Sequence, residues 1–145
     1  MKIFIKLFIL ISFASCNSNN SFELCAGNTH PYYHPILKYK GGFYEIKKYF
    51  YKNYRTSHGA NNSGIIRIQF QVNCLGESGN YDIETYNLEY DDSVIDRKIM
   101  KQLVDLTKEL TGWIPANNEE GNAVNSHKFF AFKIIDGQLK DILPK

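Results

Sequence analysis

Apolar and polar residues alternate most regularly over residues 66 to 73. This is the period of a strand that buries one face and exposes the other, as in an antiparallel sheet. The segment is therefore predicted to be a half-buried strand. Its apolar positions are Ile66, Ile68, Phe70 and Val72, and its polar positions are Arg67, Gln69, Gln71 and Asn73.

Three further strands are predicted from weaker patterns. Residues 81–88 alternate less cleanly, and residues 129–135 carry a large apolar side chain at every second position. Asp136-Gly137 then supplies the two central residues of a tight hairpin turn. We therefore expect residues 138–143 to fold back on residues 129–135 as a short final strand.

Two segments repeat apolar residues at spacings of three and four, which is the period of an amphipathic helix. The first, over residues 42–54, opens at Gly41-Gly42. The second is expected to start at Asp91 to Ser93, and Gly112 is placed to end it. The apolar stripes are Phe43, Ile46, Phe50 and Tyr54 in the first helix, and Ile95, Ile99, Leu103, Leu106 and Leu110 in the second.

Both stripes can pack on the buried face of one sheet. The predicted class is α+β: a three- to four-stranded antiparallel sheet with two helices on one face, in the order helix, strand, strand, helix, strand. The 145 residues suffice for one such domain. The expected organisation is a signal peptide over residues 1–15, a tether with an irregular N-terminal segment over residues 16–40, and the domain over residues 41–145.

The first sixteen residues have the layout of a secretory signal. Lys2 and Lys6 precede an apolar run that is too short to span a bilayer as a helix. Phe13-Ala14-Ser15-Cys16 resembles a lipoprotein signal box, with phenylalanine in place of the usual leucine. The interpretation is an exported, membrane-anchored lipoprotein whose Cys16 carries the lipid and which faces the periplasm; the alternative is a soluble periplasmic or secreted protein.

Export changes the charge balance. Removing the first fifteen residues removes Lys2 and Lys6, which leaves 15 basic and 15 acidic residues. A neutral chain gives no electrostatic support to a nucleic-acid partner, so none is expected.

Cys25 and Cys74 would face an oxidising compartment after export. A disulfide between them would fasten the N-terminal segment to the end of the first strand. Two unpaired thiols are the alternative, because sequence does not give the distance between them.

An ordered set of short motifs over roughly residues 40 to 143 resembles the C-terminal domain of TonB, the periplasmic energy transducer of Gram-negative bacteria. The resemblance implies the same order of helices and strands. The motifs are Gly41-Gly42 before the first helix, Gly64 to Asn73 with Gly76 after it, Trp113-Ile114-Pro115 after the second helix, and Phe132-Lys133-Ile134 with Asp136-Gly137 near the end.

The resemblance implies that the chain binds a peptide segment of an envelope protein, such as an outer-membrane receptor, by adding it to a strand edge. Residues 129–135 would be that edge, with Phe129, Ala131, Lys133 and Ile135 as candidate contacts. Between Cys16 and Gly41 there is neither a spanning helix nor a proline-rich arm, so we expect binding without energy transduction.

The candidate edge has two other interpretations. Its outward residues could form a second packed face under the N-terminal segment. Alternatively, residues 138–143 could cover it, either as plain protection against aggregation or as a strand that a partner displaces. Under displacement, truncation after Ile135 would strengthen binding, and residues 138–143 would be poorly protected from hydrogen exchange.

Catalytic chemistry has little support in the sequence. His30 and His34 lie among prolines with no evident third metal ligand, and Asp91-Asp92 is better explained as the start of a helix. We expect no enzyme activity, no metal and no cofactor. An assembly factor that uses the tyrosine-rich stretch of residues 32–51, or an inhibitor-like domain, are alternatives to the strand-adding module.

Overall fold

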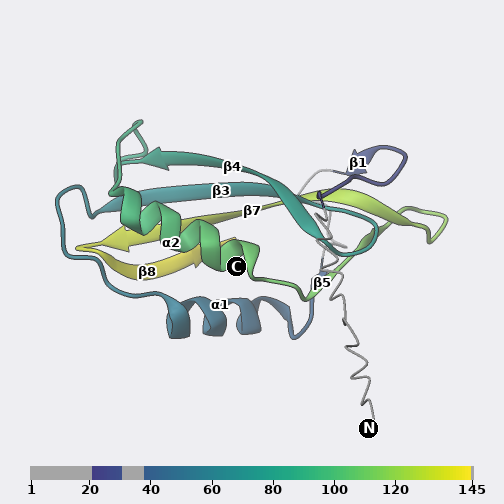
Figure 1. The fold of residues 1–145 in the computed structure, drawn as a ribbon, viewed down its shortest axis with the longest axis horizontal. Helices are drawn as coiled ribbons and strands as arrows, with labels where there is room; N and C mark the ends of the chain where they lie inside the picture. Colours follow the sequence, from purple (N-terminus) through teal and green to yellow (C-terminus); the bar gives the residue numbers. More distant parts are fainter. Residues whose placement is uncertain (1–20, 31–37, 145) are drawn as a thin grey trace, which may run out of the picture.

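The computed structural model describes residues 21–30 and 38–144 (Figure 1). The predicted signal peptide, Cys16 and His34 lie outside the described residues. Within the described part, no helix is both long enough and apolar enough to cross a membrane.

Four long antiparallel strands form the body of the sheet, in the spatial order β8, β7, β3, β4 (Figure 1). Together with two α-helices, these strands confirm the predicted α+β class. Their bounds are β3 (Gly64–Val72), β4 (Ser78–Tyr86), β7 (Ala123–Ile135) and β8 (Gln138–Leu143).

Four two-residue strands were not predicted. β1 (Thr29–His30) pairs parallel with β7, and β6 (Ala116–Asn117) pairs antiparallel with the start of β7. β2 (Lys38–Tyr39) and β5 (Trp113–Ile114) form a separate pair. Such short strands give no hydrophobic period from which they could be recognised.

The strand register puts the apolar residues of β3 and β7 on one face. Ile66 lies opposite Phe132, and Ile68 lies opposite Phe130; all four are fully buried. α1 (Gly42–Asn53) and α2 (Arg97–Lys108) both pack on this face. The core that they close includes Ile46, Phe50, Val72, Ile95, Ile99, Leu103, Ile134 and Ile142.

The second helix starts later than the prediction. Its N-cap is Asp96, whose side chain accepts a hydrogen bond from Lys98 N–H at 2.9 Å. Asp91 to Ser93 instead turn back along the end of β4, where Ser93 N–H donates to the Thr85 carbonyl at 3.1 Å. The predicted start was wrong because these turn residues form hydrogen bonds with the backbone at the end of a strand and do not cap a helix.

The second helix also ends earlier than Gly112. It stops at Lys108, although Leu110 continues the apolar stripe and is buried. Gly112 has a packing role instead, because a Cβ there would lie 2.8 Å from Cζ of the Tyr39 ring. The stripe therefore predicted burial correctly and helix length wrongly.

Candidate functional site

The predicted binding edge of β7 is covered by β8, as expected. β8 pairs with it from Ile135 opposite Gln138 to Ala131 opposite Leu143. The predicted hairpin and cover are thereby confirmed. Ile142 of β8 is fully buried in the core, so β8 is packed into the domain and is not merely laid against its edge.

Phe129, Ala131, Lys133 and Ile135 point away from the helices, because they alternate with the buried residues of β7. The Arg67 guanidinium lies over the ring of Phe129, with 5.3 Å between the guanidinium carbon and the ring centroid. Arg67 in turn pairs with Glu84 at 2.9 Å. The described N-terminal residues pair with β7 elsewhere, at Asn125 and Ser126.

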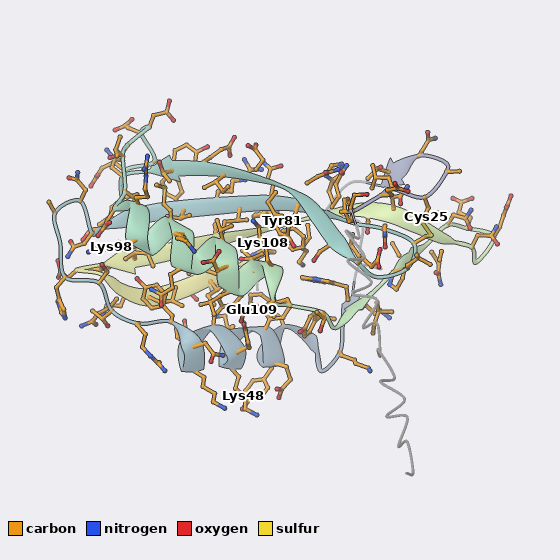
Figure 2. The ribbon with its side chains drawn as sticks, viewed as in Figure 1. Cys25, Lys48, Tyr81, Lys98, Lys108 and Glu109 are labelled. Carbon is orange, nitrogen blue, oxygen red and sulfur yellow. A yellow bond between two sulfur atoms is a disulfide. The ribbon has the colours of Figure 1, made fainter. Side chains whose placement is uncertain are left out.

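Cys25 and Cys74 form a disulfide, the first of the two alternatives that the sequence left open, with 6.0 Å between their Cα atoms. Figure 2 shows Cys25 at the end of the sheet that lies far from the Asp136-Gly137 turn. Asn73 adds a second attachment, because its Nδ2 donates to the Glu23 carbonyl at 3.0 Å. The N-terminal segment is thereby fixed to one end of the sheet.

The opposite edge of the sheet is β4, which the sequence did not single out. Among the described residues, no strand pairs with its outer side, and one isolated bridge between Tyr86 and Asp92 touches its end (Figure 1). An unpaired strand edge is a template for another extended chain. β4 is therefore the candidate functional edge of this fold.

The hydrogen bonds at the end of β4 show which of its backbone N–H and C=O groups point away from β3. Thr85 accepts from Ser93 on the side away from β3. The register with β3 is regular from Thr85 to Ile83, and N–H and C=O groups change side at each residue. The N–H and C=O of Ile83 therefore point outward. A bulge near Asn80, whose φ is 52°, interrupts this regularity toward the start of the strand.

A groove of about 350 Å³ runs beside this edge, between β4 and α2. Ile83 forms one apolar wall and is 40% exposed, while Met100 and Val104 of α2 are half-buried on the other side. Arg97 and Lys101 also line the groove. It can accept an apolar side chain in a positively charged surrounding.

The positive charge continues along α2 beside β4. Lys108 lies above the ring of Tyr81, with 5.5 Å between Nζ and the ring centroid (Figure 2). Tyr81 stacks on Phe70, and its burial raises its pKa above the ordinary value. Arg97, Lys101 and Lys108 recur at spacings of four and seven, which in the sequence is the signal that could have identified this face.

The candidate catalytic groups are not brought together. Asp91 and Asp92 are exposed in the turn beyond β4, His58 is exposed, and His127 lies beside Gln71 with 3.5 Å between their Nε2 atoms. Over residues 21–30 and 38–144, no three His, Cys, Asp or Glu residues are grouped so that they could hold a metal.

The comparisons with known proteins return no match: not to a family model, to a curated protein or to a solved structure.

Proposed function

We propose that this chain is a protein-binding module of the cell envelope, anchored by a lipid on Cys16, which takes an extended, acidic segment of a partner protein along the outer edge of β4. The supporting observation is the combination of an open strand edge, an apolar groove beside it and the cations of α2. In strand addition, main-chain hydrogen bonds supply affinity, and pockets for alternate side chains supply specificity.

The proposal keeps the binding mode that the TonB resemblance implies and moves it to the other edge of the sheet. Over Ala131 to Ile135, the equivalent edge of β7 is already used by β8. A partner strand there would have to expose Ile142, which is fully buried. On β4, the outward groups of Ile83 are available without any such cost.

The partner chemistry follows from the charges beside the edge. Arg97 has no ion pair among the described residues, and Lys108 has only its ring contact, whereas Lys101 pairs with Asp105. An extended segment with one apolar residue flanked by aspartate or glutamate would fill the groove and meet these cations. Exposed charges of this kind contribute mostly to association rate and specificity.

Photo-crosslinking in the native host tests the proposal. We would place p-benzoylphenylalanine at Arg97, on the groove, and as a matched control at Tyr44, which is 73% exposed on α1. Ile83→Pro removes the outward N–H without taking a hydrogen bond from the ladder with β3, and Ile83→Val is its conservative control. Lys101→Glu combined with Lys108→Glu tests the charge requirement.

The expected result is a discrete crosslinked partner from position 97 that is absent from position 44. Ile83→Pro and the double charge reversal should each reduce its yield about tenfold or more, and Ile83→Val should not. Equal yields from both positions, or a yield that Ile83→Pro leaves unchanged, would contradict the strand-addition proposal. The crosslinked peptide's identity separates a receptor from an assembly protein or an inhibited hydrolase.

Membrane attachment is tested separately. The mature protein should partition into detergent, and Cys16→Ala should leave the precursor unprocessed or release the protein into the soluble fraction. A soluble wild-type protein with an unmodified N-terminus would refute the lipid anchor and leave the β4 proposal standing.

A further inference from the structure

A second hollow, of about 310 Å³, lies where β2, β5 and the start of α1 meet β7, away from the β4 edge. Three of its lining residues are aromatic, and Tyr39 meets Trp113 edge-on with 5.0 Å between their ring centroids. A volume of this size is at the lower limit for ligand pockets. The residues that give it its character are Lys38, Tyr39, Phe43, Ile46, Trp113 and Lys128.

Lys128 is the unusual member of this set. It lies opposite Phe70 in the register, on the same face as Phe130, Phe132 and Ile134, which are all fully buried. The helix-facing row of β7 therefore places a cation next to a continuous apolar stripe. Desolvation lowers the pKa of Lys128, and no acidic residue pairs with it in the described part of the chain.

The ring of Trp113 forms part of the wall of the same hollow. The residue is 6% exposed, and its buried indole Nε1–H has no hydrogen-bond partner among the residues that the structure describes. A buried indole N–H normally has a hydrogen-bond acceptor. An apolar group of a ligand in the hollow would therefore lie against this ring.

Two acidic groups, on α1 and β8, are engaged in ion pairs with lysines of α1. Glu45 pairs with Lys48 at 3.5 Å, and Asp141 pairs with Lys47 at 2.9 Å. Lys47 itself lies above the Phe43 ring, with 5.5 Å between Nζ and the centroid. Within residues 21–30 and 38–144, no carboxylate lines the hollow, whereas Lys38 and Lys128 do.

We infer that this hollow binds an apolar carboxylate, with the hydrocarbon or aromatic group between Tyr39, Phe43 and Trp113 and the carboxylate on Lys128. An ammonium in a partly desolvated site makes a strong, charge-assisted hydrogen bond to a carboxylate. The same chemistry is offered by a small aromatic or aliphatic acid and by the C-terminal residue of a peptide. The inference does not depend on the β4 edge.

The single tryptophan gives the readout, because a ligand in the hollow would change its fluorescence. We would titrate the full mature chain with N-acetylphenylalanine and with N-acetylphenylalaninamide, which differ in the carboxylate. The variants are Lys128→Gln, Lys128→Arg and, as a matched control on the same strand, Lys133→Gln, whose side chain is exposed on the other face. Thermal unfolding of each variant confirms that it is folded.

The acid should bind about tenfold or more tightly than the amide, as expected for a charge-assisted bond in a partly buried site. Lys128→Gln should remove this preference, while Lys128→Arg and Lys133→Gln should retain it. Equal binding of acid and amide, no response to either, or an unchanged preference in Lys128→Gln would overturn the inference and leave an ammonium that merely extends to solvent.

Two further probes identify the source of the carboxylate. A hexapeptide ending in phenylalanine with a free C-terminus is compared with 3-phenylpropionate. Tighter binding of the peptide supports recognition of a protein C-terminus, and equal or weaker binding supports recognition of a small acid.

Discussion

The side-chain amide of Asn125 bonds both backbone groups of Cys25: Cys25 N–H donates to Oδ1 at 3.0 Å, and Nδ2 donates to the Cys25 carbonyl at 2.8 Å. Asn125 is 1% exposed, so these bonds are shielded from water. Cys74 N–H also donates to Cys25 Sγ at 3.2 Å. The N-terminal segment is thus held by a buried amide as well as by the disulfide.

We expect Asn125→Ala to lower the free energy of unfolding by about 1 to 3 kcal/mol, because two backbone groups lose their partner. Replacing Cys25 and Cys74 by serine should cost about 2 to 4 kcal/mol. The triple variant should lose less than the two costs added, since both attachments hold the same segment. Urea unfolding measures all three, with exposed Asn117→Ala as the control. Strict additivity would show that the two attachments act independently.

The fold follows from the sequence wherever burial is periodic. The apolar positions predicted in β3 (Ile66, Ile68, Phe70 and Val72) form the core together with Phe130, Phe132 and Ile134 of β7. The two helical stripes also belong to it, with Phe43 only partly buried. Asp136-Gly137 formed the predicted hairpin, for which the sequence carries a local turn signal. Where a boundary is set by a partner far away in the sequence, prediction failed: the N-cap of α2 is Asp96, whose N–H donates to the Asn61 carbonyl at 2.9 Å.

The candidate site was less predictable, for a related reason. The family resemblance directed attention to β7, and the disulfide and the cover by β8 both formed. The open edge of β4 could not be identified without strand order, because sequence does not say which strand is last in a sheet. Lys128 could have been noticed, because it continues the buried period of Phe130 and Phe132 as a charged residue.

Trp113, which follows the second helix, is buried, with 6% of its surface exposed. It contacts Phe70 and Phe130, with centroid distances of 5.2 and 6.2 Å. Trp113→Ala should therefore cost about 3 to 5 kcal/mol in urea unfolding. Ile114→Ala, next in sequence and 44% exposed, should cost much less. Wild-type fluorescence typical of a solvent-exposed indole would contradict this placement.

Tyr54 connects the end of α1 to the turn between β7 and β8. Its hydroxyl donates to the Gly137 carbonyl at 2.8 Å, and burial, reinforced by the charge of Asp96, raises its pKa to about 12 from 10.0. A pKa raised on folding means that the neutral form is favoured in the native state. The resulting stability is fully present below pH 10 and is lost as the pH rises toward 12.

Comparison of the wild-type chain with Tyr54→Phe isolates this contribution. The variant should be less stable by about 1 kcal/mol at neutral pH, the usual net value of one hydrogen bond. The difference should hold to about pH 10 and then shrink, since only the wild type must ionise a buried hydroxyl. Unfolding midpoints at several pH values measure it. A difference that is constant up to pH 12 would show that the Tyr54 pKa is not raised.

The attachment of β8 to the domain distinguishes the two interpretations of this strand, protection of the edge and displacement by a partner. Displacement requires that β8 separate at low cost, yet Ile142 is fully buried against the core, Asp141 pairs with Lys47 at 2.9 Å, and the Tyr51 hydroxyl donates to the Lys140 carbonyl at 3.2 Å. These contacts join β8 to α1 as well as to β7. β8 is thus firmly attached, whereas displacement would require weak attachment. The structure therefore favours protection of the edge.

We expect Ile142→Ala to lower the free energy of unfolding by about 2 to 5 kcal/mol, the cost of a cavity at a fully buried aliphatic position. Leu143→Ala, 37% exposed in the same strand, is the matched control and should cost far less. The amide of Ile142 should exchange as slowly as those of β3, because both segments open only when the core opens. Rapid exchange in β8 beside a protected β3, together with tighter partner binding after truncation at Ile135, would restore the displacement mechanism.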